Sequence, residues 1–291
     1  MALITKLDSS VEDSSLFKID ELLFNVKITE ANSKYRLSYQ YLSAGVGGEI
    51  KIIGNGYFTD STFTENRGKT ATVSDANRKN LYLSAGKYQI SFPRKYDLYA
   101  MSLGYEVSDV GAFQLVGGSM KYTSFGEFSS FACCNADGSG FSLDQLKLDD
   151  TNVLRLSSGN GHYVTGNLSA LEGGPIRVLS IAGSKIEGDL SSLATMTSLE
   201  ELYATDANKL TGNLSSVTSE TLNLLLMGYT GVEGTVESML DAIYDSGNGR
   251  TSGSIRVNIT GTAATYQGSP MLETKRFYFT AGGWTDVNPG S

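Results

Sequence analysis

A glycine-led phrase recurs four times in the second half of this 291-residue chain, and no other feature constrains the fold as strongly. The copies are Gly-Asn-Leu-Ser-Ala-Leu from Gly166, Gly-Asp-Leu-Ser-Ser-Leu from Gly188, Gly-Asn-Leu-Ser-Ser-Val from Gly212 and a degraded Gly-Thr-Val-Glu-Ser-Met from Gly234. Their glycines are 22, 24 and 22 residues apart. So regular a spacing indicates an internal structural repeat.

An apolar pair precedes each of these glycines and predicts a short strand. The pairs are Leu154 and Leu156, Leu179 and Ile181, Leu199 and Leu202, and Leu224 and Leu226. Each unit is then a strand, a turn closed by glycine and a second apolar turn. Because one unit cannot bury its own apolar side, neighbouring units must stack. The period therefore predicts a short leucine-rich-repeat-like β solenoid over residues 126–280, with successive strands about 4.8 Å apart.

Composition indicates a mainly β protein that is long enough for two domains. The chain is 40% apolar and has 33 glycines, 4 prolines, 16 tyrosines and 12 phenylalanines, a balance that favours short strands joined by glycine turns. After a polar arm at residues 1–20, strand patterns predict a β-sandwich or barrel-like domain for attachment or oligomerisation at residues 21–115. The solenoid and its capping strands then occupy residues 116–291.

Hydrophobic periodicity places individual elements. Strands are predicted in the first domain at residues 22–28, 35–41, 50–53, 81–83 and 88–92. Near the C-terminus, a helical face predicts a helix of about ten residues that stops at Gly247. Two strands, at residues 255–259 and 277–280, are predicted to close this end. The residues of that helical face are Val236, Met239, Leu240, Ile243 and Tyr244.

A fifth copy of the phrase is predicted at Gly126, where Gly-Glu-Phe-Ser-Ser-Phe replaces leucines with aromatic residues. Such a change is typical of an atypical end repeat that caps a stack. The insertion from Cys133 to Asp150 is then predicted to form a loop on one side of the stack.

Charge, cysteine usage and hydropathy exclude several classes of protein. The net charge of −8 and the pI of about 4.8 argue against nucleic-acid binding, which needs clustered lysine and arginine. Cys133 and Cys134 are adjacent, so we expect no disulfide framework and two reduced, buried thiols. The N-terminus shows no signal-peptide pattern, and no apolar run approaches the roughly 18 residues that span a bilayer. These features predict a soluble protein of the cytoplasm without membrane insertion.

Potential catalytic and metal-binding motifs are weak. His162 is the single histidine, and it lies in a repeat turn at no metal-ligand spacing from the cysteines. The segments that begin at Asp137 and Asp245 resemble calcium loops but lack the alternating oxygen ligands and the closing glutamate. No pair among the 31 acidic residues is singled out as a glycosidase pair. We therefore expect no enzymatic activity, no cofactor and no metal.

Three asparagines, Asn167, Asn213 and Asn258, match the glycosylation sequon. The first two belong to the repeat phrase. An asparagine after a turn glycine is expected to bond the free backbone groups of the turn, so we predict structural roles.

Alternation along the strands predicts a binding face. If Leu154 and Leu156 and their equivalents point inward, the residues between them point outward. Tyrosine, serine and arginine suit recognition of a polysaccharide or protein, because tyrosine supplies stiff, amphipathic contact area. The alternative is that this row faces solvent or a neighbouring subunit. The predicted outward row consists of Arg155, Ser180, Tyr203, Arg256 and Tyr278.

Three segments carry a resemblance to a known family: Leu-Thr-Gly-Asn-Leu-Ser-Ser-Val at 210–217, Leu-Ser-Ala-Gly-Lys-Tyr-Gln-Ile-Ser-Phe-Pro-Arg-Lys-Tyr at 83–96, and Phe-Tyr-Phe-Thr-Ala-Gly-Gly-Trp at 277–284. They resemble fibre-type structural proteins of tailed phages that infect gut Bacteroidetes, and the likeness spans roughly residues 35–285. Leucine-rich surface proteins of the bacteria share the repeat.

The resemblance implies a virion component, a head or tail fibre that assembles in the host cytoplasm. Its implied partners are other virion proteins and a host-surface polysaccharide or protein, and its implied oligomer is a homotrimer. We expect residues 1–115 to hold this oligomer, because a solenoid contacts only its sequence neighbours and offers little reason to self-associate. Two alternatives stay open: a bacterial leucine-rich adhesin or glycan-binding module, and a polysaccharide depolymerase.

Overall fold

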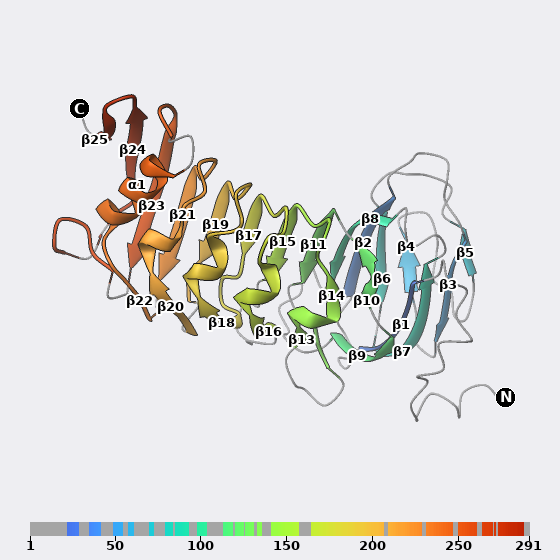
Figure 1. The fold of residues 1–291 in the computed structure, drawn as a ribbon. Helices are drawn as coiled ribbons and strands as arrows, with labels where there is room; N and C mark the ends of the chain where they lie inside the picture. The colour runs from blue at the N-terminus through green and yellow to red at the C-terminus, as the bar shows by residue number, and fades with distance from the viewer. Residues whose placement is uncertain are drawn as a thin grey trace.

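The structure, a computed structural model, is an elongated arrangement of β-strands that lie side by side along its length (Figure 1). The predicted mainly β class is confirmed. The structure describes residues 22–28, 35–41, 49–54, 58–60, 70–72, 79–83, 85–92, 98–103, 113–118, 120–124, 126–130, 133–135, 141–156, 164–206, 209–228, 231–246, 250–260, 264–269, 271 and 273–287. The N-terminal arm and His162 lie outside these residues.

A twelve-stranded sheet runs through most of this length. In spatial order its strands are β25 (Gly283–Val287), β24 (Lys275–Thr280), β23 (Ser254–Thr260), β21 (Leu224–Gly228), β19 (Glu201–Ala204), β17 (Val178–Ser180), β15 (Val153–Leu156), β11 (Glu127–Ser130), β8 (Leu98–Leu103), β2 (Tyr35–Tyr41), β6 (Lys79–Leu83) and β4 (Phe58–Asp60). Neighbours from β8 to β23 pair in parallel, whereas the pairs at both ends are antiparallel.

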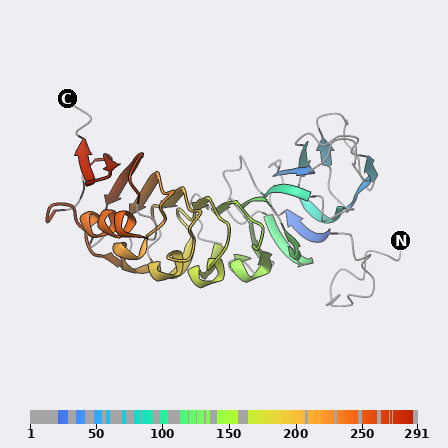
Figure 2. The same cartoon turned by 45° about the horizontal axis from the view of Figure 1, so that its top comes forward.

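A second, five-stranded parallel sheet lies opposite the C-terminal part of the first (Figure 2). Its strands are β13 (Phe141–Ser142), β16 (Val164–Asn167), β18 (Lys185–Asp189), β20 (Lys209–Asn213) and β22 (Gly231–Glu233). Short 3-10 helices follow three of them: η5 (Leu168–Leu171), η6 (Leu190–Leu193) and η7 (Leu214–Ser216). Each repeat of the sequence thus adds one strand to each sheet, and the sheets enclose the core.

Two ladders of apolar side chains fill the space behind the twelve-stranded sheet. Leu154, Leu179, Leu202, Leu225 and Val257 are in register on successive strands, and all are fully buried. Ala204, Met227 and Ile259 form a parallel ladder two residues later. The predicted inward pair Leu224 and Leu226 is therefore wrong, because pairing with β19 turns Leu225 and Met227 inward.

The repeat phrase has a specific structural role. Asn167 Oδ1 accepts a hydrogen bond of 2.9 Å from the Ser169 N–H, and Asn213 Oδ1 accepts one of 3.0 Å from the Ser215 N–H. These are the N-cap positions of η5 and η7, where the first N–H groups of a helix lack backbone acceptors. The predicted structural role of the two asparagines is confirmed.

Further strands lie around the N-terminal part of the long sheet. A six-stranded sheet contains β12 (Cys133–Asn135), β9 (Phe113–Gly118), β1 (Leu22–Ile28), β7 (Gly86–Phe92), β3 (Glu49–Gly54) and β5 (Thr70–Thr72), and a small sheet pairs β10 (Met120–Ser124) with β14 (Leu146–Lys147). The five strands predicted here are confirmed as β1, β2, β3, β6 and β7. The long sheet is continuous across the predicted domain boundary at residue 115, because β8 pairs with β11.

Two predictions in the middle of the chain are wrong. Gly126 precedes β11, which pairs with β15 in the twelve-stranded sheet, whereas Gly166, Gly188 and Gly212 lie in strands of the five-stranded sheet. Its phrase is therefore a strand of the twelve-stranded sheet and not a copy of the glycine-containing strands. Gly166, Gly188 and Gly212 also lie within strands and not in the predicted turns. The predicted loop at residues 133–150 contains β12, β13, a 3-10 helix η4 (Leu143–Gln145) and β14. Strands of two or three residues are too short for an alternating pattern to be recognised.

A helix and a hairpin close the C-terminal end. The predicted helix is confirmed as α1 (Val236–Asp245), which begins at a capping box formed by Thr235 and Ser238. The predicted closing strands lie within β23 and β24. Trp284 Nε1 donates a 2.8 Å hydrogen bond to Asp241 Oδ1, which fastens α1 to β25. Within the described residues, no helix has the length and apolar character needed to cross a bilayer.

Candidate binding face

The candidate site is the surface of the twelve-stranded sheet from β15 to β24 that points away from the core; we call it the outer face. The predicted alternation is confirmed here. The residues predicted to point inward on β15, β17, β23 and β24 are buried, and Arg155, Ser180 and Tyr203 between them are partly exposed. Arg256 is exposed, and 38% of the surface of Tyr278 is accessible.

The register brings three of the five predicted residues into one row. Arg155 pairs with Ser180, and Ser180 pairs with Tyr203. Arg256 lies two residues out of this row, because Asn258 occupies the matching position on β23. Tyr278 lies opposite Ser254, two residues further in the same direction. The predicted set therefore follows a diagonal across the face.

Tyr203 is the centre of a small polar network. Its hydroxyl donates a 2.9 Å hydrogen bond to Glu201 Oε2. Burial raises the pKa of Tyr203, the hydrogen bond to Glu201 and the charge of Glu201 raise it further, and the charges of Arg155 and Arg256 partly lower it. The phenol is therefore neutral at physiological pH and remains a hydrogen-bond donor.

Two arginines lie directly opposite each other at the C-terminal part of the face. Arg256 on β23 pairs with Arg276 on antiparallel β24, and both residues are exposed. Within the described part of the chain, neither guanidinium has a salt bridge. Two guanidinium groups on directly opposed residues can bind carboxylate or phosphate oxygens through paired hydrogen bonds.

Apolar side chains separate the tyrosine network from the arginine pair. Leu224 lies between Glu201 and Arg256 in the register, and Leu226 lies between Tyr203 and Asn258. Leu224 is 6% exposed although it points away from the core, and Leu226 is partly exposed. The face thus combines an apolar centre with charged and hydrogen-bonding groups on both sides, a composition suited to binding.

Sequence reasoning missed Glu201, Arg276 and the outward leucines. Glu201 lies two residues before Tyr203, and Arg276 lies two residues before Tyr278. Since residues i and i+2 share a face of a strand, extending the alternation by one step on each strand identifies both charged residues. The sequence pattern instead predicts Leu224 and Leu226 as the apolar pair of their repeat.

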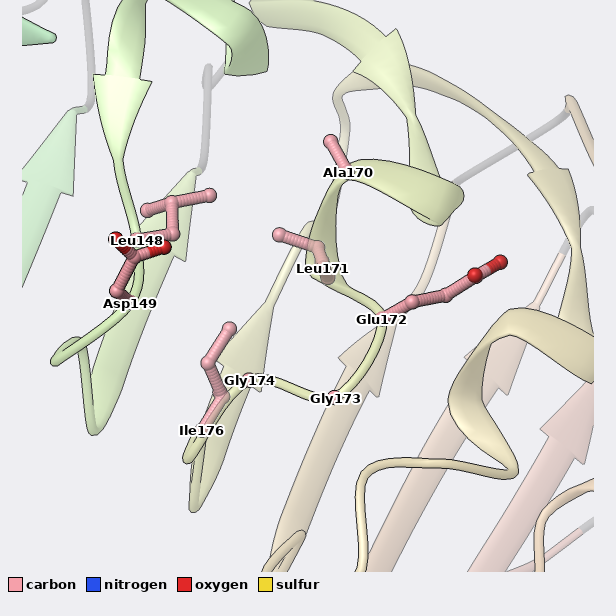
Figure 3. Close-up of a pocket in the computed structure, with 8 residues that line it drawn as sticks. All are labelled: Leu148, Asp149, Ala170, Leu171, Glu172, Gly173, Gly174 and Ile176. Carbon is pink, nitrogen blue, oxygen red and sulfur yellow. The ribbon is translucent and has the colours of Figure 1, made fainter.

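A hollow of about 180 Å³ lies on the other side of the stack (Figure 3). Leu148 and Leu171 point toward each other across it, and Glu172 points away. Its volume is below the roughly 300–1,000 Å³ of common small-molecule pockets, so the outer face is the better candidate. The hollow is lined by Leu148, Asp149, Ala170, Leu171, Glu172, Gly173, Gly174 and Ile176.

Metal-binding side chains do not gather in the described part of the chain: no three His, Cys, Asp or Glu residues there could hold an ion together. His162, the segment from Asp137 and the thiols of Cys133 and Cys134 lie outside what the structure describes. Asp245 is the last residue of α1.

Comparison with protein-family models, with curated proteins and with solved structures gives no match to this chain.

Proposed function

We propose that this chain is a virion structural protein, a head or tail fibre of a tailed phage, that binds a polysaccharide or protein of the host surface. In this proposal residues 116–291 form a leucine-rich-repeat-like solenoid with a C-terminal cap. The N-terminal strands form a sandwich or barrel-like domain that attaches to other virion proteins. The observation that carries the proposal is the outer face, a continuous array of strands, parallel from β15 to β23, whose arginine, tyrosine and serine side chains are accessible.

Several features support a display role. Stacked repeats contact chiefly their sequence neighbours and present long surfaces, which is how repeat proteins bind extended ligands. The N-terminal and C-terminal strands lie at opposite ends of the molecule, so one end can attach to a particle while the other is presented (Figure 2). The resemblance of residues 83–96, 210–217 and 277–284 to phage fibre proteins points the same way.

The proposal is tested on particles. Antibodies raised against the purified chain are expected to label phage particles in electron micrographs, and the free chain is expected to compete with particles for adsorption to host cells. Labelling of the bacterial surface in uninfected cells would instead favour the adhesin. Release of reducing sugar ends from host capsule would favour the depolymerase.

The proposed oligomer is a homotrimer held through residues 1–115. Closed symmetric assemblies are the rule for homo-oligomers, and a repeat stack offers few surfaces for self-association. Light scattering of the full chain at micromolar concentration is expected to give three times the mass of one 31.2 kDa chain. A monomer in solution that also fails to assemble on particles would contradict this arrangement.

A further inference from the structure

The Arg256–Arg276 pair places two positive charges opposite each other, and the fold does not explain this destabilising repulsion. Directly opposed residues on antiparallel strands have Cβ atoms about 4.5–5.5 Å apart, and like charges at such positions are destabilising. Within the described residues no salt bridge offsets this repulsion. The rest of the stack pairs opposite charges across neighbouring units: Arg177 with Glu200 at 2.8 Å, and Lys209 with Glu187 at 3.2 Å. Two opposed arginines without a salt-bridge partner among the described residues, in an acidic chain with net charge −8, therefore indicate a site for an external anion.

The groups around the pair indicate which anion fits. Tyr278 lies next to Arg276 on the same side of β24, and its ring is accessible. Glu201 and Tyr203 lie on β19, which is three strand steps from β24 and so about 14 Å away. A ligand that spans the face meets guanidinium donors and a tyrosine ring at one end and a carboxylate acceptor with a tyrosine at the other.

This combination fits an acidic polysaccharide. Sugar carboxylates can accept paired hydrogen bonds from the arginines, and sugar hydroxyls can donate to Glu201. The apolar faces of sugar rings can contact Tyr203, Tyr278 and the partly exposed Leu226. A nucleic-acid backbone fits poorly, because its affinity depends on many lysine and arginine contacts and Glu201 would repel its phosphates.

We propose that the outer face binds a uronic-acid polysaccharide, with its carboxylates held by Arg256 and Arg276 and its hydroxyls by Glu201 and Tyr203. The polymer runs across β19, β21, β23 and β24. This inference rests on the proposed host-surface function and specifies the ligand class of that surface.

The experiment measures binding of the full chain to polygalacturonate, hyaluronan and chondroitin, with uncharged dextran as the neutral polymer, by affinity electrophoresis. Arg256→Gln/Arg276→Gln is expected to weaken binding to the preferred uronate polymer at least about tenfold, since charge-assisted hydrogen bonds are lost. The control is Lys185→Gln/Lys209→Gln, which removes the same charge from exposed positions of the five-stranded sheet. It is expected to bind as the parent chain does.

Arg256→Lys/Arg276→Lys separates charge from geometry, because lysine keeps the charge without the paired fork. Its binding is expected to fall between those of the parent and the glutamine variant. Circular dichroism is expected to show that the glutamine variant melts no lower than the parent, since a repulsion is removed. Weakened binding in a variant that melts lower would mean that the arginines stabilise the fold, which overturns the assignment.

Three other results overturn the inference: no binding to any uronate polymer, equal binding to dextran, or equal weakening in the lysine-site control. Its failure is distinguishable from failure of the proposed function. If the glutamine variant still blocks phage adsorption as the parent does, the carboxylate site is wrong and host-surface binding stands. If the chain binds a uronate polymer through the arginines but never competes with particles, the site stands and the fibre assignment fails.

Discussion

The carboxylate of Asp189 lies directly against the backbone of Gly212, 23 positions later in the chain: a Cβ built on Gly212 would lie 2.5 Å from each carboxylate oxygen. Gly212 also has a φ of +94°, which side-chain-bearing residues rarely adopt. Asn213 has the same relationship to Gly234, where the Cβ would lie 2.5 Å from Oδ1. The asparagine or aspartate of one phrase and the glycine of the next are therefore one packing unit, which explains why they recur together.

Gly212→Ala is expected to lower the free energy of unfolding by about 2–4 kcal/mol, because it adds a clash to an unfavourable φ. Gly268→Ala is the matched control, since Gly268 has a φ of +75° and open space around its Cβ position. That variant is expected to lose only about 1–2 kcal/mol, the cost of the backbone conformation. Urea denaturation followed by circular dichroism measures both.

The clash itself can be isolated with a second substitution. Asp189→Ala removes the carboxylate that the new Cβ would meet, so Gly212→Ala is expected to cost less in that background. Equal costs in both backgrounds would show that φ alone makes Gly212 necessary.

The acid sensitivity of the stack is expected to depend in part on Asp189. Hydrogen bonds from the Ser191 N–H and hydroxyl lower the pKa of Asp189 below its ordinary value of 3.8. A carboxyl group with a lowered folded-state pKa stabilises the fold above its unfolded pKa, and this contribution is lost as the pH falls through the folded pKa. Asp189→Asn retains the capping oxygen, as Asn167 and Asn213 do, but does not titrate.

The measurement is the free energy of unfolding of parent and Asp189→Asn between neutral pH and pH 3. The difference between them is expected to be constant at neutral pH and to shift in favour of Asp189→Asn as the pH falls below about 4. Because Asp189 is exposed, the shift is expected to be small. A parallel loss of stability in both proteins would mean that Asp189 keeps its ordinary pKa.

The register of β21 can be tested with two adjacent leucines. Leu225 is fully buried and lies in the core ladder, whereas Leu226 points away from the core and is partly exposed. Leu225→Ala is expected to cost about 2–5 kcal/mol, the range for a buried leucine that leaves a cavity. Leu226→Ala is expected to cost less than about 1 kcal/mol. The opposite order in thermal denaturation would restore the register predicted from sequence.

Sequence predicted the repeats, the C-terminal helix and most strand positions because these depend on local patterns. The glycine phrase can be recognised in the sequence because positions 188 and 212 require glycine. Both have a positive φ, and both lie against a side chain of the preceding phrase. Arg155, Ser180 and Tyr203 could be predicted as neighbours because strict alternation fixes which side of a strand each occupies.

The wrong predictions concern features that depend on strand pairing and not on the local sequence pattern. The run Leu-Leu-Leu-Met at 224–227 has no alternation, so only pairing with Leu202 decides that Leu225 points inward. The Gly126 phrase has the right letters, but its pairing with β15 places it in the other sheet. The Arg256–Arg276 pair depends on the register between two consecutive strands, β23 and β24, and the pattern of either strand alone does not contain that register.

Removing two buried hydroxyl groups, those of Thr151 and Ser219, is expected to change the free energy of unfolding in opposite directions. Thr151 is fully buried, and its hydroxyl has no hydrogen-bond partner among the described residues. The Ser219 hydroxyl is also buried, but it lies 2.8 Å from the Leu199 carbonyl and 3.1 Å from that of Thr197.

Thr151→Val keeps the shape and removes an uncompensated polar group, so it is expected to raise the free energy of unfolding by about 1 kcal/mol. Ser219→Ala removes a bonded group and is expected to lower it by a similar amount. Urea denaturation of the two variants measures both changes, and a loss of stability in Thr151→Val would mean that its hydroxyl is bonded in solution, for example to a buried water.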